Sequence, residues 1–180
     1  MRTKIHIVTV LSLLLIGGCS TTRPMATVDQ VDIDRFMGDW FVIGHIPAFV
    51  EADAYNAVES YKRVDEDTIQ TTYTFREGGF DGEKEVMTPV GTIRNTETNA
   101  EWGMQFIWPI QAEYLITYID EDYSTTVVSR SKRDYVWIMA REPQIPDAEY
   151  EKLVDIVGEQ GYDLSELRKV PQQWDGKPGY

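Results

Sequence analysis

The chain has 180 residues, which is enough for one domain with a sizeable core but short for two. Hydrophobic residues make up 42% and aromatic residues 12%, so the chain can bury enough apolar surface to fold, and disorder is expected near the ends alone. The 30 acidic residues outnumber the 17 basic ones, which argues against binding nucleic acid and against charge-driven docking onto anionic headgroups.

The first nineteen residues have the form of a secretory signal. Arg2 and Lys4 precede a mostly apolar run over residues 5–16, which is too short to span a bilayer comfortably. The run ends in Ile-Gly-Gly-Cys at 16–19, which resembles a bacterial lipobox. The alternative is a buried N-terminal helix with an ordinary cysteine at position 19.

The lipobox resemblance implies that residues 1–18 are cleaved and that Cys19 carries a covalent lipid. Ser20 resembles the signal for delivery to the outer membrane, so we expect a lipid-anchored protein there, on the periplasmic side. Cys19 is the sole cysteine, and its acylation leaves no thiol for a disulfide, a metal site or catalysis. Cleavage also leaves 15 basic residues against 30 acidic ones.

Residues 19–28 are small and polar, so we expect a lipidated N-terminus followed by a flexible tether. At about 3.3 Å per residue, the tether holds the domain up to roughly 30 Å from the membrane. The predicted domain runs over 29–174 and leaves a C-terminal tail at 175–180.

Short runs rich in Val, Ile, Thr, Tyr and Phe follow, separated by turn residues, which is typical of antiparallel β structure. The predicted strands are residues 40–46, 54–64, 68–76, 85–95, 101–108, 113–120, 125–130 and 135–141. Consecutive strands at hairpin spacing favour an up-and-down barrel, which removes exposed sheet edges, and a two-sheet sandwich is the alternative.

One later segment has a helical period. Apolar residues recur at i, i+3, i+4 and i+7 from Tyr150 to Val157, after a proline and before two glycines. This predicts an amphipathic helix over 147–160 that packs on the outside of the barrel.

Three motifs follow one another in chain order at residues 32–41, 122–123 and 133–143, and together they resemble the lipocalins, in particular the bacterial outer-membrane and apolipoprotein D-like branch. Residues 32–41 (Asp-Ile-Asp-Arg-Phe-Met-Gly-Asp-Trp-Phe) resemble the first lipocalin signature, and Asp122-Tyr123 resembles the second more weakly. Residues 133–143 (Arg-Asp-Tyr-Val-Trp-Ile-Met-Ala-Arg-Glu-Pro) resemble the third. The resemblance covers about residues 31–174.

The resemblance implies an all-β fold, namely an eight-stranded antiparallel calyx with an N-terminal 3₁₀ turn and one C-terminal α-helix outside. It places Trp40 at the closed end with Arg141 laid across the indole as a cation–π contact. Gly38, Trp40 and Arg141 are therefore expected to be structural, and ligand binding is expected at the opposite end.

Alternation along the strands, phased by the family's second strand, predicts which side chains face the interior. The predicted ligand-binding residues are Phe49, Glu59, Tyr61, Tyr73, Phe75, Trp102, Met104, Phe106, Tyr114, Ile116, Tyr118 and Trp137. The alternative for each strand residue is plain core, because parity does not separate cavity from filling and a bulge inverts a strand.

Two of these predictions need separate comment. A carboxylate at Glu59 inside an apolar barrel is costly unless it is protonated or paired, for example with Arg63 or Arg94, or unless local register exposes it to water. By family geometry the loop over 46–55 covers the mouth, where Phe49 either contacts an acyl chain or packs on the barrel rim.

No catalytic residue, no metal site and no cofactor beyond the lipid on Cys19 are predicted. Once His6 is removed with the signal, His45 is the sole remaining histidine. Neither a cluster of histidines that binds a metal nor a Ser-His pair accompanied by a second histidine can then form.

The resemblance implies binding of fatty acids, lysophospholipids or similar molecules for storage, transport or membrane maintenance, and we expect a monomer or dimer. The alternatives are a lipocalin-like isomerase or hydrolase with Glu59 or His45 as base, and a structural envelope protein with a filled barrel.

Overall fold

The computed structural model describes residues 24–47 and 51–175. The elements are α1 (Ile33–Phe36), β1 (Gly38–Ile46), β2 (Ala54–Arg63), β3 (Thr68–Glu77), β4 (Lys84–Met87), β5 (Val90–Ile93), β6 (Glu101–Ile107), β7 (Ile110–Ile119), β8 (Thr125–Ser129), β9 (Val136–Ala140), α2 (Asp147–Glu159) and β10 (Arg168–Lys169). Cys19, the predicted signal and Phe49 lie outside the described residues. Within the described ranges, no helix is both long and apolar enough to cross a bilayer.

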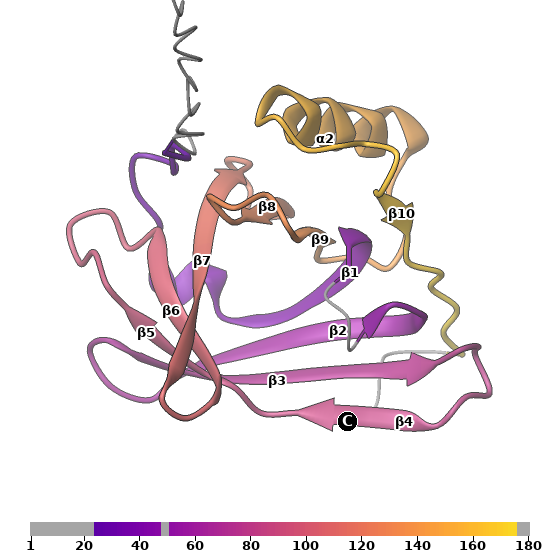
Figure 1. Cartoon of the computed structure of the whole chain (residues 1–180), viewed down its shortest axis with the longest axis horizontal. Helices are drawn as coiled ribbons and strands as arrows, with labels where there is room; N and C mark the ends of the chain where they lie inside the picture. Colours follow the sequence, from indigo (N-terminus) through magenta and orange to yellow (C-terminus); the bar gives the residue numbers. More distant parts are fainter. Residues whose placement is uncertain (1–23, 48–50, 176–180) are drawn as a thin grey trace, which may run out of the picture.

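The strands form an antiparallel meander that closes on itself (Figure 1). Neighbours along the chain are hydrogen-bonded from β1 to β9, with β5 between β3 and β6. The first and last strands of this path then pair with each other, from Phe41 opposite Ala140 to Ile46 opposite Val136. The eight-stranded barrel is therefore confirmed over the sandwich, with β4 and β5 together taking the place of one strand.

The predicted strand at 85–95 is divided into β4 and β5 around Pro89. Proline has no backbone N–H for the sheet, and here its carbonyl oxygen instead accepts from the Thr71 amide at 3.1 Å. On the N-terminal side of this break, β4 pairs with the end of β3 near the mouth. On the C-terminal side, β5 pairs with β3 and β6. The short strand β10 adds to the outer part of β1.

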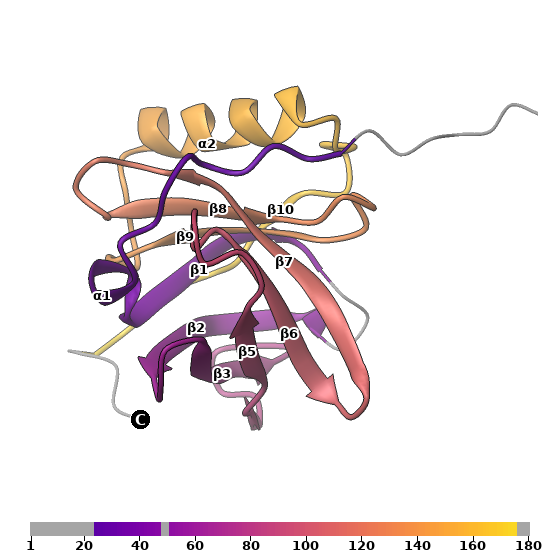
Figure 2. The same ribbon diagram turned by 90° about the vertical axis from the view of Figure 1, so that its left-hand side faces the viewer.

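The helix α2 lies across the outside of the barrel over β8 and β9 (Figure 2). It ends at Glu159, one residue short of the prediction, and buries Leu153 and Val157 against outward-facing residues of β1, β8 and β9. Gly44 permits the close approach, because a Cβ there would lie 2.7 Å from the Tyr150 hydroxyl. These strands are therefore buried on both faces.

Aromatic side chains fill the barrel at the end where α1 lies. Phe36 contacts Trp40, Tyr61 and Trp102 with ring centroids 5.2 to 5.5 Å apart. Trp102 in turn stacks on Tyr114 at 5.2 Å. The α1 turn has i to i+4 bonds, so it is α-helical rather than the expected 3₁₀ turn.

Arg141 covers the end of the barrel next to α1 from outside. Its guanidinium carbon lies 3.8 Å from the Trp40 ring centroid, and the guanidinium donates to four carbonyl oxygens at 2.7 to 3.1 Å. The four acceptors belong to Arg35, Phe36, Met37 and Asp39. Gly38 supplies the required backbone, since its φ of +91° is unfavourable for other residues. Gly38, Trp40 and Arg141 therefore belong to one set of contacts at this end of the barrel.

We predict that Arg141→Lys lowers the free energy of unfolding by about 2 to 4 kcal/mol, because an ammonium cannot reproduce the planar fork and leaves carbonyls unsatisfied. The measurement is urea denaturation at pH 7. Arg94→Lys is the matched control, since Arg94 makes an exposed bond to Gln111. Equal effects of the two substitutions would contradict the role given to Arg141.

Candidate functional site

A cavity of about 170 Å³ lies inside the barrel, beyond the aromatic filling. We call it the inner cavity, and its lining residues are Glu51, Glu59, Tyr73, Met87, Phe106, Ala112, Tyr135 and Trp137. They come from β2, β3, β4, β6, β7, β9 and the segments before β2 and β9. The wall is therefore assembled from most of the barrel and is mainly apolar.

Glu59 lies on this wall at the boundary with the filled end. Its side chain is 3% exposed, so the alternative that local register exposes it to water is not what the structure shows. The Tyr61 hydroxyl donates to the Glu59 carboxylate, and the Tyr61 and Tyr114 hydroxyl oxygens are 2.6 Å apart. Because Tyr61 has one proton to give, Tyr114 donates to Tyr61 when Glu59 is ionised.

Neither arginine proposed as a partner of Glu59 reaches it. Arg63 donates to the carbonyl oxygens of Asp65 and Glu66, and Arg94 donates to Gln111. Burial raises the pKa of Glu59 to about 7, the Tyr61 hydrogen bond opposes this, and the charge of Glu51 adds to it. The buried acid is thus accommodated by protonation rather than by an ion pair.

Glu51 brings a second carboxylate to the same cavity from the loop before β2. It is 2% exposed and accepts from the Trp137 indole N–H, with Nε1 to Oε1 at 3.2 Å. Burial and the charge of Glu51 raise the pKa of Tyr73, whose ring lies on the same wall. Two acids, an indole and a phenol therefore surround one small volume.

Four of the predicted ligand-binding residues line the inner cavity, namely Glu59, Tyr73, Phe106 and Trp137. Six others, Tyr61, Phe75, Trp102, Met104, Tyr114 and Ile116, belong to the buried cluster inside the barrel and lie outside the lining of this cavity. Alternation correctly predicted that these six side chains point into the barrel. They pack as core there, which was the alternative given for each strand residue. Phe49 lies outside the described residues.

The inward direction predicted for Tyr118 is wrong. The register between β7 and β8 shifts between Ile116 and Tyr118, so one extra residue turns the later side chain to the outer face. Tyr118 packs with the cluster under α2, and the Lys152 ammonium donates to its hydroxyl at 3.0 Å.

Sequence reasoning missed four lining residues. Ala112 and Tyr135 share the parity of the neighbouring predictions Tyr114 and Trp137, so alternation could have found them. Met87 faces the cavity as the cross-strand partner of Tyr73, a pairing that the break at Pro89 obscures. Glu51 had no signal of this kind, because it lies between strands.

His45 is also buried, at 0% exposure, but it does not line the inner cavity. It pairs with Trp137 across β1 and β9, which places it on the inner face of the barrel. Neither ring nitrogen has a hydrogen-bond partner in the described part of the chain. Burial, aided by Arg168, lowers its pKa to about 4, so the ring is neutral and a weak base at pH 7.

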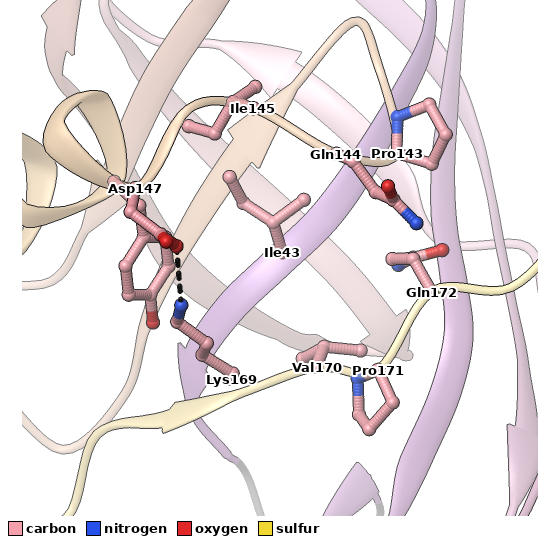
Figure 3. Close-up of a pocket in the computed structure, with 10 residues that line it drawn as sticks. Ile43, Pro143, Gln144, Ile145, Asp147, Lys169, Val170, Pro171 and Gln172 are labelled. Carbon is pink, nitrogen blue, oxygen red and sulfur yellow. Dashed lines mark hydrogen bonds and ion pairs between the residues drawn. The ribbon is translucent and has the colours of Figure 1, made fainter.

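A second hollow lies on the outer surface between the start of α2 and the C-terminal segment (Figure 3). It is larger, at about 450 Å³, and includes Ile43, Ile145 and Val170 with polar neighbours. Lys169 and Asp147 form an exposed ion pair across it at 3.4 Å. Because the inner cavity lies inside the barrel and has the more apolar wall, it is the better candidate despite its size.

The hairpin between β6 and β7 exposes apolar side chains beside the inner cavity. Ile107, Trp108 and Ile110 are 71%, 82% and 69% exposed. Residues 102–112 contain no charged side chain. Phe106, 45% exposed, belongs to both this hairpin and the cavity wall, so the cavity reaches the surface next to an apolar patch.

Among the described residues, no group of three or more His, Cys, Asp or Glu side chains is arranged to hold a metal ion.

A family model described as "Lipocalin-like domain" matches residues 31–172. The chain belongs to the lipocalin family. Temperature-induced lipocalin-1 of Arabidopsis thaliana is 28% identical over 158 residues, covering 83% of this chain and 84% of the relative. The outer membrane lipoprotein Blc of Escherichia coli (strain K12) is 24% identical, with 88% and 90% covered. Apolipoprotein D of Bos taurus is 23% identical, with 80% and 78% covered.

Solved structures show the same lipocalin fold. Insecticyanin from the tobacco hornworm Manduca sexta superposes with a TM-score of 0.63 at 16% identity, over 82% of this chain and 84% of that one. Lobster apocrustacyanin A1 gives a TM-score of 0.61 at 13% identity, over 78% and 79%. The fold and the family together indicate a barrel for hydrophobic ligands.

We predict that the lipocalin loses stability as the pH rises through 7, because Glu59 must then ionise in a buried site. A folded pKa of about 7 against an ordinary value of 4.5 means full stability below pH 4.5. At about 1.4 kcal/mol per pH unit, the loss by pH 8 is about 3 kcal/mol. Glu59→Gln removes this loss, so its advantage over the parent grows with pH.

Urea denaturation between pH 5 and pH 8 measures this difference. Glu66→Gln is the matched control, because Glu66 is exposed in the turn between β2 and β3. Parallel stability curves for the parent and Glu59→Gln would show that Glu59 does not titrate in this range.

Proposed function

We propose that this lipocalin is a lipid-anchored protein of the outer membrane that binds fatty acids, lysophospholipids or similar single-chain lipids for storage, transport or membrane maintenance. The inner cavity carries the proposal, because it lies inside the barrel, has mainly apolar walls and opens beside an exposed apolar hairpin. The name of the Blc relatives supports the location, and the Ile-Gly-Gly-Cys sequence at 16–19 supports the anchor.

The energetics are those of enclosure without covalent change. Each buried CH₂ contributes on the order of 0.8 kcal/mol, so part of an acyl chain in the cavity and part against the hairpin gives useful affinity after ordering costs. The apolar tip at Ile107, Trp108 and Ile110 supports entry from a lipid surface, since the acidic chain has little attraction to anionic headgroups.

We propose binding rather than catalysis. The enzyme alternative uses Glu59 or His45 as base, and His45 is neutral, buried and off the cavity wall. Glu59 is hydrogen-bonded to Tyr61 within the core. No cofactor other than the covalent lipid on Cys19 belongs to this proposal.

The test is native mass spectrometry of the protein isolated from membranes, followed by uptake of added lysophospholipid. We expect copurified or added lipid on the parent and a loss of about tenfold or more in uptake by Ala112→Phe, whose ring fills the cavity. Gln111→Phe is the control, because Gln111 is exposed on the same strand. A clean apo spectrum without uptake would instead favour a filled structural barrel.

A further inference from the structure

The inner cavity is acidic as well as apolar. Among the described residues, eight line the cavity; two of them, Glu51 and Glu59, are carboxylic acids, and none of these eight is Lys, Arg or His. Both acids are almost fully buried. Glu59 ionises as the pH rises through about 7, so a ligand group placed here then meets negative charge in a medium of low dielectric, where charge interactions are strong.

The remaining walls are rich in aromatic rings. Tyr73, Phe106, Tyr135 and Trp137 all line the cavity, and the Tyr135 and Trp137 ring centroids are 4.9 Å apart. The faces of such rings carry partial negative charge and attract cations, ammonium groups included. Acids and rings thus favour the same sign of ligand charge.

The Tyr73 phenol adds a polar group to the same wall. The residue is 2% exposed and lines the cavity. Burial and the neighbouring Glu51 raise its pKa, so the phenol stays neutral and contributes no positive charge to the site.

We propose that the inner cavity holds the ammonium group of a single-chain amphiphile, either a protonated or a quaternary amine, between the acids and the aromatic walls. This inference names the ligand class of the same site and rests on the proposed function. Within the lipids proposed above, it favours those that carry an amine and makes free fatty acids the poorer ligands.

The size of the cavity agrees with a head group rather than a whole chain. A volume of about 170 Å³ is close to that of a cavity of about 150 Å³ known to hold one benzene molecule. A small alkylammonium group fills it, and the chain then leaves past Phe106, which is 45% exposed, toward the apolar hairpin. A carboxylate in the same place would be repelled by Glu51 and Glu59.

The preference depends on pH through Glu59. The ionisable groups that face it are Glu51 from the preceding loop, Tyr61 on its own strand, Tyr73 on β3 and Tyr114 on β7. All three phenols have raised pKa values and stay neutral at pH 8. Glu59, with a pKa of about 7, gains charge between pH 6 and pH 8, so the ammonium preference rises over this interval.

The experiment compares three probes that differ in the head group alone: dodecyltrimethylammonium, dodecanol and dodecanoate, each below its micelle-forming concentration. Trp137 lies on the cavity wall, so quenching of tryptophan fluorescence and calorimetry both report binding. At pH 8 we expect the ammonium probe to bind about tenfold tighter than dodecanol, and dodecanoate to bind more weakly than dodecanol.

The outcomes separate the two proposals. Dodecanoate binding as tightly as the ammonium probe would overturn the ammonium inference and leave lipid binding intact. Binding of none of the three probes would overturn both. An ammonium preference that does not grow between pH 6 and pH 8 would contradict the part played by Glu59.

Variants then locate the charge. Glu51→Gln/Glu59→Gln should bring the ammonium and dodecanol affinities to within about threefold of each other while dodecanol binding persists. The matched control is Glu66→Gln/Glu142→Gln, which removes two exposed acids and tests whether the acidic surface alone attracts the probe. Equal loss of preference in both double variants would assign the effect to the surface and overturn the inference.

Discussion

The contact between Arg141 and Trp40 is the constraint on which the rest of the barrel depends. The guanidinium donates to carbonyl oxygens of the α1 turn and the start of β1, and it covers the indole. With the entry of the chain fixed in this way, Phe36 fills the end of the barrel and packs against the aromatic core.

The filled end also explains the chemistry of the cavity. Because the aromatic core excludes water, Glu59 has no solvent to stabilise its charge and relies on Tyr61 and on protonation. An acid held in this state is costly for stability, and natural proteins retain such groups mainly at functional sites. The packed closed end of the barrel and the raised pKa of Glu59 are thus two consequences of the same aromatic packing.

Most of the fold was predictable from the sequence, and the candidate site was predictable in part. The periods of the strands and of the helix, together with the motifs around Trp40 and Arg141, are local sequence patterns, and the elements they predict are present in the structure. Tyr118 was misplaced because a β-bulge adds one residue without any local mark, and the break at Pro89 hid the pairing that turns Met87 inward. Glu51 reaches the cavity through the path of a loop, which alternation does not describe.

The break at Pro89 has a consequence for the hierarchy of local stabilities. The hydrogen-bonded ring of the barrel runs through β5 and bypasses β4, which pairs with β3 alone among the described strands. Unfolding of β4 therefore costs four residues of ladder and leaves the closed ring intact, so its amides should exchange with solvent well before those of β8 or β9. Since Met87 belongs to β4, one panel of the cavity wall belongs to the least cooperative part of the sheet.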